Sequence, residues 1–190
     1  MKADQRFVLP TRYKGVKFRS RREARWAVFF DTLGIQWLYE PEAYWLGEMA
    51  YLPDFWLPQL NCFWEVKAGK DDEEKMRRLV KLTGKAVYVH YGEIALNRAF
   101  FYSAPDESLY DQSHSAHKLW IREGQDAWDN FYLWCECPKC SLLGIEFEGR
   151  AARLPCSCKP PSEADEDSWH NASSPRILAA YRAAQRYRFW

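Results

Sequence analysis

Three side chains between positions 54 and 67 are suited to metal-assisted hydrolysis. Asp54 lies in "YLPDFWL", and Glu65 and Lys67 lie in "NCFWEVKAGK". Successive side chains of a strand alternate faces, so Glu65 and Lys67 are predicted to share one face while Trp64 and Val66 occupy the other. If the two segments pair, Asp54 reaches the same neighbourhood, and two carboxylates and an ammonium meet at one edge of a sheet.

Such a polar group is costly to assemble without a purpose. Adjacent carboxylates repel and shift each other's pKa unless a cation lies between them. Mg²⁺ is a hard cation that binds one or two carboxylates together with waters and substrate phosphate oxygens. The pattern therefore indicates a divalent-metal site, and the alternative is an ordinary charge pair between Glu65 and Lys67 on an exposed strand face.

A second group of candidate ligands lies in "WCECPKCSLLGIEFEGRAARLPCSC". Two cysteines form a C-P-x-C knuckle, and a second pair follows after a glycine-marked, hairpin-like segment. Four thiolates suit tetrahedral zinc, which stabilises modules too small to bury a core of their own. The predicted ligands are Cys137, Cys140, Cys156 and Cys158.

Other cysteines and histidines have weaker claims to a metal. The C-x-C spacing of the second pair is tighter than C-x-x-C, so Cys135 or His170 is an alternative ligand. Cys62 lies alone in an aromatic strand and is interpreted as a buried small hydrophobe. His114 and His117 fall in a serine-rich polar stretch that favours a loop.

The elements that would position these residues follow from hydrophobic periodicity. The segment 20–34 predicts a helix that begins at Ser20 and ends at Gly34. Two alternating runs around "PQLN" predict a hairpin, "DDEEKMRRLVKLTG" predicts a second helix, and "KAVYVHYG" predicts a buried strand. This order is typical of an α/β domain with a mixed sheet.

Composition favours a folded protein without a membrane segment. The chain has 190 residues, of which 47% are hydrophobic and 17% aromatic, which is ample for a core. The opening "MKADQRFVLP" lacks an apolar run of signal-peptide length, and no stretch approaches the ~20 apolar residues of a membrane span. We therefore expect a cytoplasmic protein, in which cysteines serve as metal ligands or buried thiols rather than disulfides.

Charge is distributed unevenly along the chain. The formal net charge is +1, but residues 1–25 carry +7 and the remainder −6. A basic arm on a nearly neutral protein is the electrostatic pattern of a polyanion binder, and the alternative is a solvated N-terminal segment. The predicted phosphate contacts are Arg12, Lys14, Arg19 and Arg21.

The sequence resembles a nuclease family around the first group. "PD" at Pro53 and Asp54, followed after ten residues by "EVK" at Glu65, Val66 and Lys67, is similar to the signature of the PD-(D/E)XK nuclease superfamily, whose fold is shared by many restriction endonucleases. The phrases "FRSRREARWAVFF" and "YLPDFWL" also resemble small nucleases of phages and actinobacterial genomes. The resemblance covers about residues 13–95.

The resemblance implies roles for individual residues. Asp54 and Glu65 would bind Mg²⁺ or Mn²⁺, the backbone carbonyl of Val66 would add a ligand, and Lys67 would position or activate the attacking water. Glu23 would complete the site from the first helix. Glu23 also stands three residues after Ser20, and S-x-x-E is a capping box, so the two roles remain alternatives.

Together these observations predict a restriction-endonuclease-like mixed β-sheet core flanked by helices, with a small C-terminal zinc ribbon and a terminal helix. The expected division is a nuclease core at 1–130, the ribbon at 131–160, an acidic linker at 161–174 and a basic amphipathic helix at 175–190 that either docks on the body or contacts nucleic acid. The expected function is metal-dependent endonucleolytic cleavage of phosphodiester bonds, with DNA as the expected substrate and RNA as an open alternative. The chain would act alone, as a homodimer or with a protein partner. The alternative is a non-catalytic nucleic-acid-binding or assembly module that retains the nuclease fold.

Overall fold

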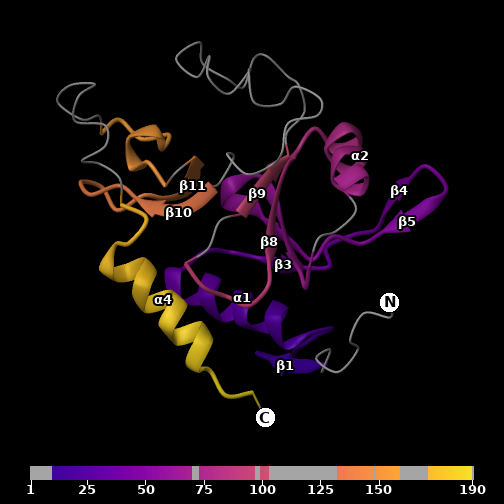
Figure 1. The fold of residues 1–190 in the computed structure, drawn as a ribbon, viewed down its shortest axis with the longest axis horizontal. Coiled ribbons are helices and arrows are strands. Elements are labelled where there is room, and N and C mark those ends of the chain that lie inside the picture. Colours follow the sequence, from indigo (N-terminus) through magenta and orange to yellow (C-terminus); the bar gives the residue numbers. More distant parts are fainter. Residues whose placement is uncertain are drawn as a thin grey trace.

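A mixed β-sheet with helices on both faces organises the protein (Figure 1). The structure is a computed structural model that describes residues 10–69, 73–96, 99–102, 132–147, 149–158 and 171–189. Its largest sheet has seven strands in the order β11-β10-β9-β8-β7-β6-β3. The predicted α/β class with a mixed sheet is confirmed.

Five of the six strand pairs in this sheet are antiparallel, and the pair formed by β7 and β8 is parallel. A parallel pair needs a crossover connection, and the helix α2 at Glu73–Thr83 supplies it. The strands are β3 (Leu38–Tyr39), β6 (Phe55–Leu57), β7 (Cys62–Lys67), β8 (Ala86–Tyr91), β9 (Ala99–Tyr102), β10 (Tyr132–Glu136) and β11 (Leu143–Phe147).

Two small hairpins accompany the large sheet. The first pairs β1 (Thr11–Tyr13) with β2 (Val16–Phe18) in the basic arm. The second pairs β4 (Tyr44–Leu46) with β5 (Met49–Tyr51), and it projects beside α2 in Figure 1. Thus the basic arm is folded structure from Thr11 onward.

The first helix begins and ends where its sequence predicts. Helix α1 spans Arg21–Leu33, and the Ser20 hydroxyl accepts a hydrogen bond from the backbone N–H of Glu23. Gly34 adopts φ 74°, the left-handed conformation that ends many helices, and its N–H bonds back to Asp31 and Phe30.

The hairpin around "PQLN" is also confirmed. Strands β6 and β7 are joined by a 3₁₀ turn, η2, at Pro58–Leu60, and Asn61 takes the left-handed conformation at φ 51°. The predicted second helix and following strand correspond to α2 and β8.

One face of the sheet carries an aromatic core under α1 and the C-terminal helix α4 (Pro175–Arg186). Trp26 lies 4.5 Å from Trp64 between ring centroids, and Phe29 lies 4.6 Å from Tyr181 of α4. Figure 1 shows α4 running beside α1. The helix predicted at 175–190 therefore docks on the body of the protein.

The opposite face is covered by α2 and by the β4–β5 hairpin. Met76, Leu79 and Val80 of α2 pack with Phe63 of β7 and with Leu46 of β4. This face is smaller and less aromatic than the α1 face, and it is the face on which the side chains of Glu65 and Lys67 lie, in phase with Phe63.

The cysteine-rich hairpin continues the main sheet. β10 pairs with β11 along its length and with β9 through Tyr132 and Ala99. A short 3₁₀ turn, η4, at Ala151–Arg153 follows the hairpin. His114, His117, His170 and residues 161–170 of the predicted linker lie outside the described residues. None of the described helices combines the length and hydrophobicity needed to cross a membrane.

Candidate active site and metal centre

The structure brings Asp54, Glu65 and Lys67 together. The β6–β7 register pairs Phe55 with Trp64, so Asp54 and Glu65 are directly opposite each other just beyond that pair. Directly opposite residues of antiparallel strands point to the same face, here the α2 face. We call these three residues the polar cluster.

Hydrogen bonds fix the geometry of the polar cluster. The Lys67 ammonium lies 2.7 Å from Glu65 Oε2 and 3.4 Å from Asp54 Oδ2. The backbone N–H of Val66 donates to Asp54 Oδ2 at 2.8 Å, and the backbone N–H of Asp54 donates to Glu65 Oε1 at 3.1 Å. Each carboxylate is therefore held by the backbone of the other strand as well as by the lysine.

Tyr51 belongs to this cluster and was missed by sequence reasoning. Its hydroxyl donates to Glu65 Oε2 at 2.6 Å, and its ring centroid lies 5.6 Å from Lys67 Nζ. Tyr51 ends β5, three residues before Asp54, so a short turn brings it back over the cluster. The available sequence signal was a tyrosine three residues before Asp54, which itself stands just before a strand.

Burial makes the cluster electrostatically demanding. Glu65 is fully buried and Asp54 is 7% exposed. Desolvation, followed by the negative charge of Glu65, raises the pKa of Asp54 well above its usual range, although Lys67 and the Val66 N–H oppose the shift. Desolvation alone would lower the pKa of Lys67, but the two carboxylates outweigh it and raise that pKa.

Glu23 lies nearby but is engaged elsewhere. Its carboxylate accepts hydrogen bonds from the Ser20 hydroxyl at 2.6 Å, the Arg19 N–H at 3.1 Å and the Tyr39 hydroxyl at 2.5 Å. Within the described part of the chain, no hydrogen bond joins it to Asp54 or Glu65. Its charge still contributes to the raised pKa of Asp54, which places it within electrostatic reach.

The four arginines and lysines predicted to contact phosphate fall into two groups. Lys14 pairs with Asp31 at 2.8 Å, and Arg19 pairs with Glu40 at 2.5 Å. Arg12 and Arg21 are exposed and have no ion pair among the described residues. The basic arm is thus partly neutralised by acids of the domain itself.

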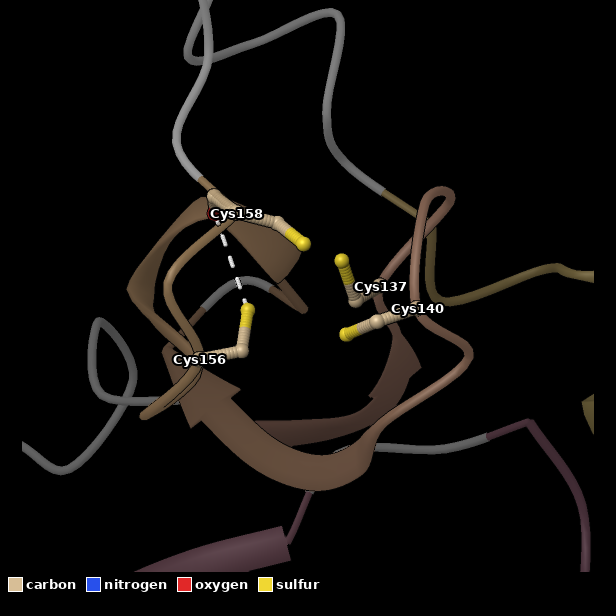
Figure 2. A group of neighbouring side chains, drawn as sticks. All are labelled: Cys137, Cys140, Cys156 and Cys158. Carbon is tan, nitrogen blue, oxygen red and sulfur yellow. Dashed lines mark hydrogen bonds between the residues drawn. The ribbon is translucent and has the colours of Figure 1, made fainter.

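The four predicted zinc ligands come together at one end of the β10–β11 hairpin. The sulfurs of Cys137, Cys140, Cys156 and Cys158 all lie within 4.8 Å of one another. Figure 2 shows the two pairs facing each other from two separate loops. In the part of the chain that the structure describes, this is the only group of three or more cysteines, histidines or acids gathered closely enough to hold a metal ion. We call it the cysteine cluster.

Backbone hydrogen bonds shape both loops of the cysteine cluster. The N–H of Cys137 donates to Leu142 O at 2.8 Å, and the N–H of Ser141 donates to Cys137 O at 2.9 Å, closing the first knuckle. Burial would raise the pKa of the Cys137 thiol, but backbone N–H groups of Cys140 and Lys139 lower it to about 7. A thiolate is the form that binds zinc, so this knuckle favours metal binding.

Cys135 does not belong to this group. It lies on β10, is fully buried, and burial raises the pKa of its thiol. Cys62 is buried in β7, which confirms its interpretation as a small hydrophobe. The sulfur of Cys158 lies with those of the other three predicted ligands, because the turn after Leu154 brings it back toward the first knuckle. The alternative ligand His170 lies outside the described residues.

Arg176 links the cysteine cluster to the helices. Its guanidinium donates to Leu33 O at the end of α1 at 2.6 Å and to Ser141 O in the knuckle at 3.3 Å. It also pairs with Glu136 at 3.3 Å. A single side chain at the start of α4 therefore contacts α1, β10 and the first knuckle at the same time.

Comparison of the chain with protein-family models, curated proteins and solved structures finds no match. The two clusters and the surfaces around them therefore carry the evidence for function.

Proposed function

We propose that the protein is a metal-dependent endonuclease that hydrolyses phosphodiester bonds in DNA, with the polar cluster as its active site. The observation that carries this proposal is the contact of one ammonium, on Lys67, with two buried carboxylates at the end of β7. The same residues carry the sequence resemblance to PD-(D/E)XK nucleases. The mixed sheet with helices on both faces is compatible with a restriction-endonuclease-like core.

The polar cluster has the charge and the donors for a divalent cation. Two carboxylates and one ammonium leave a net charge of −1 in a buried place, which a cation would offset. Oδ1 of Asp54 accepts no hydrogen bond from any described residue, whereas its Oδ2 accepts two. Asp54, Glu65 and the Val66 carbonyl would hold Mg²⁺ or Mn²⁺, which lowers the pKa of a bound water and neutralises phosphate charge.

The chain's own residues would orient and balance this site. Tyr51 and the Asp54 N–H hold the two oxygens of Glu65, so this carboxylate is fixed before substrate arrives. Lys67 supplies a permanent positive charge that stabilises negative charge developing on the phosphate, and its position permits it to orient the attacking water. Glu23, held by Ser20 and Tyr39, would act through its charge rather than as a direct ligand.

We further propose that the cysteine cluster holds structural zinc. A tetrahedral Zn²⁺ with Zn–S bonds of about 2.3 Å requires sulfurs about 3.8 Å apart, which is compatible with the observed grouping. The module's own apolar core consists of few residues, among them Ala151 and Leu154, so a metal would contribute much of its stability.

A non-catalytic nucleic-acid-binding module is the second candidate, and one observation favours it. Lys67 already lies between the carboxylates, and Glu23 does not join them in a close three-acid group. The retention of all three polar residues favours the enzyme, because a binding module needs none of them.

The deciding experiment is cleavage of supercoiled plasmid in Mg²⁺, Mn²⁺, Ca²⁺ and EDTA. We expect nicking or linearisation in Mg²⁺ or Mn²⁺ only, and its loss in Asp54→Asn. Lys81→Ala, an exposed change on α2, is the matched control that should cut normally. Branched, linear and single-stranded DNA and RNA substrates define the preferred structure. A linear product at the earliest times would indicate two active sites, as in a homodimer.

A further inference from the structure

A basic cleft lies between the first turns of α1 and the segment that follows α4. Its volume is about 400 Å³, and four arginines and no acidic residue line it. The arginines come from opposite ends of the sequence: Arg21 and Arg25 from α1, and Arg186 and Arg188 from the C-terminal segment. Gln185, Tyr187 and Phe189 complete the lining.

The C-terminal side of the cleft is held in place by aromatic contacts. Tyr187 and Phe189 pack edge-on against Tyr13 of β1, with ring centroids 5.1 and 6.4 Å apart. Gln185 donates to Ile94 O at 3.0 Å. Arg186 and Arg188 therefore extend from a fixed backbone, although the sequence places them more than 160 positions from Arg21.

The positive charge of this cleft is poorly compensated. Within the described ranges, Arg21, Arg186 and Arg188 have no ion pair, and Glu93 alone pairs with Arg22 at 2.7 Å and Arg25 at 2.9 Å. Nε of Arg25 is buried and has no hydrogen-bond partner among the described residues. Four guanidinium groups around one concavity repel one another unless an anion lies among them.

The cleft and the polar cluster are connected through the chain that leaves β8. Gly92 donates its N–H to Lys67 O at 2.8 Å, and the next residue, Glu93, holds Arg22 and Arg25. Both features therefore lie at the carboxyl ends of the parallel strands β7 and β8, a common place for ligands in sheets with parallel strands.

We infer that this cleft binds phosphate groups of the nucleic-acid strand whose cleavage is proposed above. The inference rests on the proposed function for the identity of the ligand. Arginine is suited to the contact because its planar fork donates two parallel hydrogen bonds to phosphate oxygens. The C-terminal segment thereby becomes part of the substrate path, together with the start of α1.

The test is binding of a labelled duplex over a salt series, in Ca²⁺ to suppress cleavage. The variant is Arg186→Gln with Arg188→Gln, and the control is Arg77→Gln with Lys81→Gln, which removes the same charge from exposed positions of α2. Loss of two phosphate contacts should reduce the slope of log affinity against log salt by about 1.8, or about 0.9 per contact. Relative to binding at 1 M salt, this is a loss of about eightfold in affinity per contact at 0.1 M salt. The control should keep the wild-type slope. The double variant Arg186→Lys with Arg188→Lys, which keeps both positive charges, should keep it as well.

The outcomes separate this inference from the proposed activity. A reduced slope in the glutamine variant supports phosphate binding in the cleft even if the wild-type protein cleaves no substrate. In that case only the nuclease proposal fails. A wild-type slope in the glutamine variant overturns phosphate binding in the cleft, even if the wild-type protein cleaves plasmid in Mg²⁺. Absence of binding to duplex, single-stranded DNA and RNA by wild type also overturns it. Circular dichroism of each variant confirms that the fold is intact.

Discussion

The polar cluster and the cysteine cluster both gather groups that bind metals, but the protein supports them in opposite ways. Asp54 and Glu65 are held by backbone N–H groups, a tyrosine and a lysine inside a seven-stranded sheet with cores on both faces. The cysteines lie in two loops at the margin of that sheet, over a small core. The first arrangement is held by groups of the protein itself, whereas the second is the one that we propose a zinc ion holds together.

This difference suits the polar cluster to catalysis and the cysteine cluster to stabilising the fold. In a preorganised site the protein fold already holds the ligand groups in place, so the fold does not need the cation. A cation bound there can exchange and can act on a substrate. A loop site gains its order from the metal, so the metal contributes to folding free energy. Removal of metal should therefore silence the polar cluster without unfolding it, and should disorder the cysteine cluster.

The largest expected effect is on cleavage. Asp54→Asn and Lys67→Met should each reduce the cleavage rate by about 10³-fold, because each removes a charge aimed at the phosphate or metal. Their effects on stability should differ. Asp54→Asn relieves repulsion with Glu65 and should leave the free energy of unfolding unchanged or higher, since the pKa of Asp54 is raised in the folded state.

Lys67→Met, in contrast, leaves two buried carboxylates without their cation and should cost about 3–5 kcal/mol in Mg²⁺-free buffer. Cleavage rates and urea unfolding of both variants provide the measurement. Full activity in either variant would remove the polar cluster from the active site, and equal destabilisation by both would contradict its description as a site with excess negative charge.

The second prediction concerns zinc. Purified protein should contain one zinc per chain, and Cys137→Ser or Cys156→Ser should lose it together with order in residues 132–158. The expected loss in free energy of unfolding is at least about 4 kcal/mol, because zinc binding to cysteine-rich modules is worth about 10–16 kcal/mol. The measurements are metal content by mass spectrometry and hydrogen exchange.

Cys135→Ala is the matched control for the zinc prediction. It removes a buried thiol from the same strand, so it should lower stability modestly and retain zinc. Zinc loss in this variant, or disulfides in the wild-type protein, would show that the cysteine cluster is assigned incorrectly.

The third prediction concerns the aromatic core on the α1 face of the sheet, opposite the face that carries the polar cluster. His90 of β8 is fully buried between Trp26 and Trp64, and neither ring nitrogen has a hydrogen-bond partner among the described residues. Burial lowers its pKa to about 4, although the nearby charge of Glu93 opposes the shift. The unfolded chain binds this proton more tightly, so stability is lost as pH falls from about 6.5 to about 4.

The expected contribution is about 3 kcal/mol over that range. The measurement is the free energy of unfolding from urea titrations at pH 7.5, 5.5 and 4.5, for wild type and His90→Phe. The difference between the two profiles isolates His90 from the carboxylates. Parallel profiles would mean that the pKa of His90 is the same in the folded and unfolded states, which would contradict the shift expected from its burial.

Sequence reasoning located the residues of both clusters but not their surroundings. Strand phase placed Glu65 and Lys67 together, and the "PQLN" turn brought Asp54 opposite them, because both depend on local geometry alone. Tyr51 and Arg176 were missed, since their contacts cross between elements that no local pattern connects. The basic cleft was missed for the same reason, because it joins two ends of the chain that meet only in the folded structure.

The smallest expected effect decides whether Glu23 belongs to the polar cluster or only to the start of α1. As part of a helix cap, Glu23→Gln and Ser20→Ala should each lower the free energy of unfolding by about 1 kcal/mol and leave cleavage nearly unchanged. As part of the active site, Glu23→Gln should reduce cleavage at least about tenfold more than Ser20→Ala, since only Glu23 contributes charge near Asp54. The measurement is cleavage rate against unfolding free energy for both single variants and the double variant. Equal, small losses of activity in the two single variants would assign Glu23 to the cap, and the polar cluster would then act through Asp54, Glu65 and Lys67 alone.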